Sequence, residues 1–164
     1  MTGPTKENIT AEMRRVFGDD EKRIAHAMSV LSYAEEILLE VAADRGVVVA
    51  AALLHDIGIH EAERKYGSSA GRYQEIEGPP IAERILESLD ADAGFIAEVC
   101  DIVGHHHSPR KNETPDFKVL YDADRIVNLR DDGLPSGLSL SEEKAQRMFL
   151  TPAGLKTARG ALPN

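Results

Sequence analysis

Apolar residues recur at helical spacing along most of this chain. Within residues 20–46, Ile24 and Met28 begin one apolar face at a step of about 100° per residue, and the polar strip opposite is narrow. Residues 47–58 read VVVAAALLHDIG, which is typical of a buried helix, and Gly58 is placed to end it as a C-terminal cap. The sequence has no alternating apolar and polar run flanked by hairpin turn residues. The pattern therefore predicts an all-α fold.

The remaining segments divide into helices and two polar loops. Pro79 and Pro80 are expected to open a helix, because proline is favoured in the first turn. Residues 59–78 are polar and irregular and are expected to form a loop over a pocket, and the segment that follows Gly104 is expected to form a second loop. Further helices are expected over residues 5–17, 79–90, 93–104 and 116–132, with a last one from about Ser141. The chain is thus predicted to be one helical bundle over residues 1–164, with a C-terminal helix and tail over residues 135–164.

Composition narrows the class of protein. A chain of 164 residues is long enough for one domain with a core and short for two. With 42% hydrophobic and 29% charged residues, it has the composition of a globular protein. A net charge of -9 without a basic stripe argues against a long nucleic acid as partner. A small phosphorylated substrate stays compatible with this charge if a metal ion supplies local positive charge.

The chain carries no sign of export or of membrane insertion. Cys100 is the single cysteine, so no disulfide can form within the chain. Residues 1–10 lack the apolar stretch of a signal peptide. The longest apolar run, Val47 to Leu54, is far shorter than the roughly 20 residues that cross a bilayer. A cytoplasmic location without membrane contact is the expectation.

Three of the expected helices place a metal-capable side chain on a surface that should be buried. These side chains are His26, the adjacent pair His55 and Asp56, and Asp124. Each has an ordinary explanation: a core histidine, a hydrogen-bonded pair at a helix end, and a carboxylate paired with a nearby arginine. Burying a carboxylate costs several kcal/mol unless it is paired or bound to a cation. One metal ion would satisfy both carboxylates and use both imidazoles as neutral ligands.

The order and context of these residues resemble a known family. The stretches RIAHAMSVLSYA, AALLHDIG and VLYDADRIVNL are similar to the motifs of the HD-domain metal-dependent phosphohydrolases, over residues 20–130. The resemblance implies an all-α bundle in which His26, His55, Asp56 and Asp124 hold a divalent transition metal, such as Mn, Fe, Co, Ni or Zn. Asp124 is preferred to Asp122 because it matches the Ala-Asp-Arg context.

The same resemblance suggests further site residues. His105 and His106 follow a helix as a histidine pair does in family members with two metals, and we expect them to be catalytic or to complete a second metal site, with His107 further out. Two positions depart from the family pattern. Gln74 stands where members with two metals carry a histidine, and Ile59 stands where many members carry a lysine.

The expected function is hydrolysis of a nucleotide or another small phosphate ester through a metal-activated water, with Asp56 or Asp124 accepting a hydrogen bond from that water. Candidates for substrate binding are Arg23, Arg125, Asn128, Lys65 and His60. Two alternatives stay open at this point. One is a di-iron oxygenase of the same fold, and the other is a non-catalytic module that binds a metal or a nucleotide.

Overall fold

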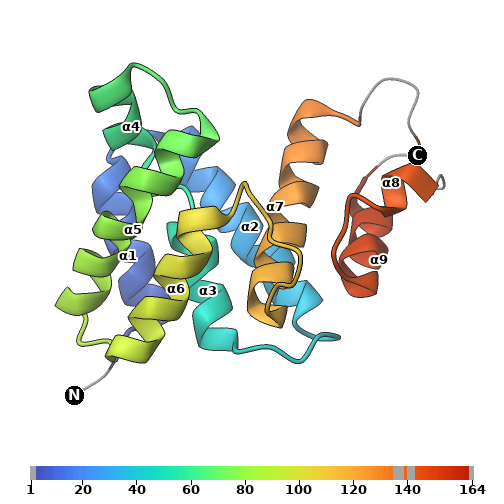
Figure 1. The fold of residues 1–164 in the computed structure, drawn as a ribbon, viewed down its shortest axis with the longest axis horizontal. Helices are drawn as coiled ribbons and strands as arrows, with labels where there is room; N and C mark the ends of the chain where they lie inside the picture. The colour runs from blue at the N-terminus through green and yellow to red at the C-terminus, as the bar shows by residue number, and fades with distance from the viewer. Residues whose placement is uncertain (1–2, 135–138, 140–142, 163–164) are drawn as a thin grey trace.

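The computed structural model describes residues 3–134, 139 and 143–162, and over these residues the chain is helical and has no strand (Figure 1). The all-α prediction is confirmed. The helices are α1 (Lys6–Phe17), α2 (Glu21–Ile37), α3 (Arg45–Leu54), α4 (Ile59–Tyr66), α5 (Gly71–Ser88), α6 (Ala93–His105), α7 (Pro115–Asp132), α8 (Glu143–Gln146) and α9 (Pro152–Ala161).

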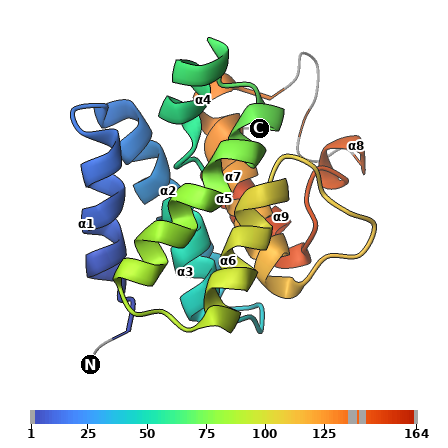
Figure 2. The same cartoon turned by 60° about the vertical axis from the view of Figure 1, so that its left-hand side comes forward.

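Helix α3 forms the centre of the bundle. Every residue from Val47 to Leu54 is buried. Helices α1, α2, α6 and α7 pack around it, as Figures 1 and 2 show. A helix that is apolar on all sides needs neighbours on all sides, so this sequence dictates its central place. His55 follows directly as the C-cap of α3 and is therefore carried into the interior.

The expected helix over residues 20–46 is two helices. Helix α2 ends at Ile37, and the chain turns before Asp44 caps a new helix by accepting a hydrogen bond from the Val47 N–H at 3.2 Å. Gly46, the last residue of this stretch, lies in the first turn of α3. The Asp44 cap and the strongly apolar run after it therefore start a new helix, although the helical spacing of apolar residues continues across this stretch.

Gly58 does not end α3 with a left-handed cap. Its φ is -84°, and it stands directly before α4. A Cβ atom at this position would lie 2.5 Å from the Gly78 nitrogen and 2.8 Å from the Gly78 Cα, so the turn after Asp56 touches the backbone of α5. The glycine is needed here for close approach and not for backbone conformation.

Residues 59–78 form α4 and the first half of α5, where a loop was expected. Pro79 and Pro80 lie inside α5 and do not open it. Each proline removes one helical hydrogen bond, which normally breaks a helix. Here Gly78 and Ala82 are buried on either side of them, and α5 makes extensive contact with α6. Tertiary packing therefore outweighs the local preference of this segment.

The C-terminal helix α9 is fastened to α7 by Asp122. This fully buried carboxylate accepts hydrogen bonds from the Leu150 N–H at 2.8 Å, the Thr151 N–H at 2.9 Å and the Thr151 hydroxyl at 2.7 Å. The expected helix start at Ser141 lies outside the described residues; within residues 135–164, where a C-terminal helix and tail were expected, the structure has α8 and α9. None of the described helices is long and apolar enough to cross a membrane.

Candidate metal centre

Four side chains from three parts of the bundle meet at one point. His26 projects from α2, Asp124 from α7, and His55 and Asp56 from the end of α3. The His26 Nε2 atom lies 3.0 Å from Asp124 Oδ1 and 3.3 Å from Asp56 Oδ2. The His55 Nε2 atom lies 3.3 Å from Asp124 Oδ1, 3.4 Å from Asp56 Oδ2 and 3.3 Å from His26 Nε2. The structure thus brings together all four residues that the sequence indicated.

These separations fit a single metal ion. Ligand atoms about 2.1 Å from an ion lie about 3.0–3.4 Å from one another, depending on whether the geometry is octahedral or tetrahedral. The contacts above span 3.0 to 3.4 Å. The donor set of two imidazole nitrogens and two carboxylate oxygens suits a divalent transition metal. The residues present therefore fit the ion that the sequence analysis expected.

The hydrogen bond on the far side of His55 aims its other nitrogen at this point. Its Nδ1–H donates to the Ala52 carbonyl at 2.8 Å, which leaves Nε2 facing the two carboxylates. Burial alone would lower the pKa of His55, but the Asp56 and Asp124 carboxylates raise it to about 9. Burial would raise the pKa of Asp124, yet the charges of His55 and His26 hold it well below its usual value. Without an ion, the cluster keeps its carboxylates charged and takes up protons on imidazole.

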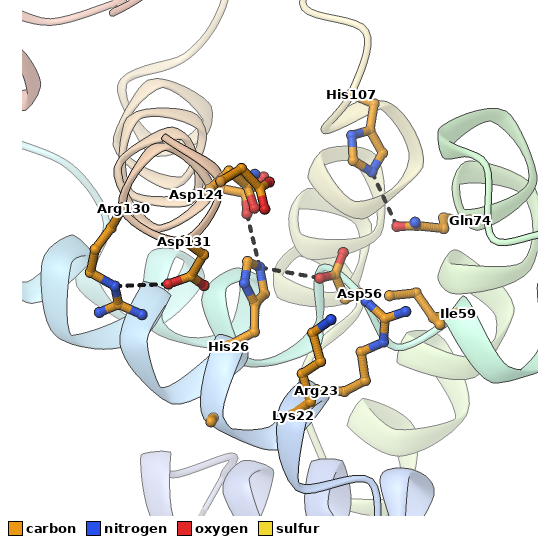
Figure 3. A pocket seen from close by; sticks show the side chains of 13 residues that line it. Lys22, Arg23, His26, Asp56, Ile59, Gln74, His107, Asp124, Arg130 and Asp131 are labelled. Carbon is orange, nitrogen blue, oxygen red and sulfur yellow. Dashed lines mark hydrogen bonds and ion pairs between the residues drawn. The ribbon is translucent and has the colours of Figure 1, made fainter. Parts of the chain in front are cut away.

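Three of the four side chains lie on the wall of a cavity of about 350 Å³ (Figure 3). His26, Asp56 and Asp124 face the cavity, and His55 lies fully buried behind them. Other lining residues come from the first turn of α2, from α5 and from the C-terminal half of α7; they include Lys22, Arg23, Gln74, Asn128, Arg130 and Asp131. The cluster is therefore accessible to a small polar molecule.

Comparison with known proteins assigns the chain that carries this site to a family. The model of the HD-domain family matches residues 23–129, which is more than half of the chain and includes all four clustered residues. This chain belongs to the HD-domain family. The resemblance seen in the sequence is thereby confirmed, together with the all-α fold that it implied.

A solved structure supports the same assignment. The HD-domain chain is 27% identical to a predicted HD superfamily hydrolase from an uncultured Thermotogales bacterium, whose crystal structure it matches with a TM-score of 0.69. The match covers 94% of this chain and 83% of the other one. A search of curated proteins finds no match.

Of the two histidines expected beside the metal centre of this HD domain, one does not lie there. His105 ends α6 and points away from the cluster: its Nε2 lies 2.9–3.0 Å from both Glu113 oxygens, and its Nδ1 lies 2.5 Å from the Asp101 carbonyl. Its ring also stacks on Phe117. His105 therefore holds the ends of the loop after α6 together. The sequence could not show this, because one step along a helix end turns a side chain by about 100°.

His106 and His107 are the histidines that face the site. The His106 Nε2 atom lies 3.5 Å from Asp56 Oδ1 and is buried without a hydrogen-bond partner among the described residues, while Nδ1 donates to the Val103 carbonyl at 2.8 Å. His107, which was expected further out, lines the cavity and can join Asp56 and His106 in a second group of ligands. Buried polar atoms normally have a hydrogen-bond partner, so this nitrogen is available to a molecule or ion that enters the site.

The residues expected to bind substrate divide into two groups. Arg23 and Asn128 line the cavity of the HD domain, and Arg125 lines a smaller adjoining hollow, where its guanidinium lies over the Tyr121 ring at 5.2 Å. Lys65 and His60 do not line either one.

Lys65 and His60 have partners elsewhere. Lys65 is paired with Glu77 at 2.9 Å on the outside of α4 and α5. His60 is bound to Asp20 at 2.7 Å and packs edge-on against Phe17. Both were placed near the pocket on the assumption that residues 59–78 form a loop, and α4 turns them away from it.

Sequence reasoning also missed Lys22, Arg130 and Asp131. Lys22 precedes Arg23, which was singled out, and both belong to the exposed first turn of α2. Arg130 and Asp131 follow Asn128 along α7, and their side chains are paired with each other at 3.0 Å. The available signal was their nearness to the motif residues, but charged residues at helix ends are common without any function.

Proposed function

We propose that this HD-domain protein is a metal-dependent phosphohydrolase that acts on a nucleotide or another small phosphate ester. The observation that carries the proposal is that the His26 and His55 Nε2 atoms lie 3.0–3.4 Å from the Asp56 and Asp124 carboxylate oxygens, beside a cavity that Lys22 and Arg23 also line. A divalent ion held by His26, His55, Asp56 and Asp124 would act as a Lewis acid toward a phosphoryl oxygen and make water a better nucleophile.

The chain's own cations suit a phosphoryl group. Lys22 and Arg23 lie together on one side of the cavity, near Asp56 (Figure 3). Among the described residues, neither side chain forms an ion pair with a carboxylate. They also stand in the first turn of α2, where the helix dipole adds positive potential. In a chain of net charge -9, these two free cations favour a phosphate over a neutral substrate.

Two residues are placed to accept hydrogen bonds or protons during hydrolysis. Asp56 directs Oδ2 at the metal cluster and Oδ1 at His106, so its carboxylate can accept a hydrogen bond from the attacking water. The His106 Nε2 atom has its orientation fixed by the Nδ1–H bond to Val103 and has no partner of its own. It can accept a hydrogen bond from a substrate or water O–H at this place.

The proposal is tested by stripping the protein of metal and adding back Mn²⁺, Co²⁺ or Zn²⁺, one at a time, with phosphomonoester and phosphodiester substrates. We expect phosphate release that depends on the added ion. Asp56→Ala should lose more than about 100-fold in activity together with its bound metal, because it removes a ligand. The exposed Asp19→Ala variant is the matched control and should behave like the wild type. Full metal retention by Asp56→Ala would contradict the proposal.

The second group of ligands, Asp56, His106 and His107, gives a specific reason to consider a di-iron oxygenase as well. That chemistry requires two irons and consumes dioxygen, so two irons per chain with no phosphate release would favour it. A binding module would retain metal and release no phosphate with any substrate. An iron count on the purified protein before stripping, combined with the phosphate-release assay, therefore separates all three functions.

A further inference from the structure

A second group of potential ligands adjoins the proposed metal centre. Asp56 belongs to both groups, since Oδ2 faces His26 and His55 while Oδ1 faces His106 at 3.5 Å. His107 completes the second group. Judged by its donor atoms alone, this second group could bind a second metal ion.

Gln74 argues against a second ion, because the orientation of its side-chain amide is fixed. The amide nitrogen donates to the Ser69 carbonyl at 2.6 Å, and a carbonyl can only accept. The atom that lies 3.1 Å from the His107 Nε2 atom is therefore the amide oxygen. Two lone pairs at this distance would repel each other, so the contact is a hydrogen bond in which His107 Nε2–H donates. A nitrogen that carries a proton has no lone pair for a metal.

The ring of His107 is also held in place. Its backbone N–H donates to Glu75 at 3.1 Å, and the hydroxyl of Ser108 donates to the same carboxylate at 3.1 Å. A Cβ atom on Gly71 would touch the ring at 3.0 Å, so α5 lies directly against it. Figure 3 shows the ring nitrogen that binds Gln74 on the side of the ring nearer to Asp56. The nitrogen best placed to serve a second ion is thus the one that Gln74 occupies.

Charge balance leads to the same conclusion. Asp56 and Asp124 supply two negative charges, which one divalent ion neutralises. Gln74, His106 and His107 add no negative charge, so a second ion would leave two positive charges uncompensated beside Lys22 and Arg23. Such an excess is costly in a site whose carboxylate side chains are 13% exposed. Two other carboxylates line the cavity: Asp131 lies on the opposite side from His107 and is paired with Arg130 (Figure 3), and Asp132 follows it at the end of α7.

We propose that this chain binds one divalent ion, at His26, His55, Asp56 and Asp124, and that Gln74 sets this number because its neutral amide accepts the His107 Nε2–H and supplies neither the charge nor the ligand oxygen that a second ion needs. The inference rests on the proposed metal centre and specifies its stoichiometry.

The test is a count of bound metal that needs no substrate. Metal-stripped protein is equilibrated with Mn²⁺ in phosphate-free buffer, freed of unbound ion, and analysed for metal per chain. The wild type should hold about one ion, and Gln74→Glu, which adds a charge and a ligand oxygen, should hold about two. Gln74→Met removes the amide without adding charge and should stay at about one. Paramagnetic resonance gives a second measure, because an isolated Mn²⁺ ion shows resolved hyperfine lines and a coupled pair shows a broadened signal.

Each outcome bears on one claim. Two ions in the wild type would overturn the inference while leaving the hydrolase proposal intact. One ion in both the wild type and a folded Gln74→Glu would refute the role of Gln74. No ion in the wild type would overturn the metal centre and with it the proposed function. If Gln74→Glu does not fold, the wild-type count still decides the number of ions.

Discussion

Replacing Gly58 with alanine should weaken both the fold and the metal centre. Gly58 lies two residues after Asp56, and its φ of -84° is open to any residue, so the substitution causes no backbone strain. The added Cβ atom would lie 2.5 Å from the Gly78 nitrogen, 2.8 Å from the Gly78 Cα and 3.0 Å from the Gln74 carbonyl oxygen. All three are backbone atoms of α5, which cannot move aside as a flexible side chain can.

The size of the effect follows from this overlap. Restoring a contact of about 3.5 Å requires the turn and α5 to separate by about 1 Å. Overpacking of this kind costs about 1–3 kcal/mol, and the reduced freedom of the unfolded chain returns about 0.4–1 kcal/mol. A net loss of about 1–2 kcal/mol corresponds to a melting temperature about 2–8 °C lower for a chain of this length. The same shift displaces Asp56 from its partners, so the affinity for Mn²⁺ should fall at least about 10-fold.

Thermal unfolding followed by circular dichroism measures the first effect, and Mn²⁺ titration measures the second. Gly160→Ala in α9 is the matched control, because a Cβ atom there meets nothing within 4 Å. That variant should melt no lower than the wild type and bind Mn²⁺ equally well. If Gly58→Ala has the melting temperature and ion affinity of the wild type, the close contact between the turn and α5 is not what positions Asp56.

Three further predictions follow from the site and its surroundings. Because the pKa of His55 is about 9 in the metal-free chain, against an ordinary 6.5, Mn²⁺ must displace a proton, and its affinity should rise as the pH increases from 6.5 to 9. The charged imidazole also stabilises the metal-free fold; this contribution is complete below pH 6.5 and should be lost as the pH rises through about 9. Calorimetry at several pH values measures both the Mn²⁺ affinity and the stability. An affinity independent of pH would contradict the assignment of His55 as a ligand. Lys22→Ala should raise KM for a phosphate ester about 10-fold or more at unchanged metal content, whereas Lys65→Ala, whose ammonium is paired with Glu77 outside the cavity, should leave KM unaltered in steady-state kinetics. Asp122→Ala leaves three donors of the α9 segment without their acceptor and should cost about 2–4 kcal/mol in urea unfolding, with faster protease cleavage near residue 150; an unchanged urea midpoint would show that α9 is held by other contacts.

The sequence identified the four side chains that cluster better than it predicted the secondary structure around them. His26, His55, Asp56 and Asp124 could be found because burying polar groups on apolar helix faces is costly and therefore conspicuous. The all-apolar run before His55 identified α3 for the same reason. These features depend on residue type and helical period, which the sequence shows directly.

The errors arose where tertiary contacts decide the structure. Gly58 resembles a helix cap, but it is glycine because the Gly78 backbone touches it. Pro79 and Pro80 resemble a helix start, but packing against α6 carries α5 through them. Helical periodicity and turn chemistry are local signals, and neither reports which distant backbone approaches a residue.

The choice between His105 and His107 failed for a geometric reason. The three histidines are consecutive, and the sequence does not show where α6 ends. Since α6 ends at His105, that side chain turns toward Glu113, whereas His106 faces Asp56 and His107 faces the cavity. A shift of one residue in the end of a helix thus changes which side chains reach the site.

The most direct test of the metal centre is anomalous X-ray diffraction from crystals of the wild-type protein grown with Mn²⁺. We expect an anomalous peak between the His26 Nε2, His55 Nε2, Asp56 Oδ2 and Asp124 Oδ1 atoms, about 2.1 Å from each. Crystals that show no peak at this place, with His55 Nε2–H donating a hydrogen bond to Asp124 instead, would contradict the account.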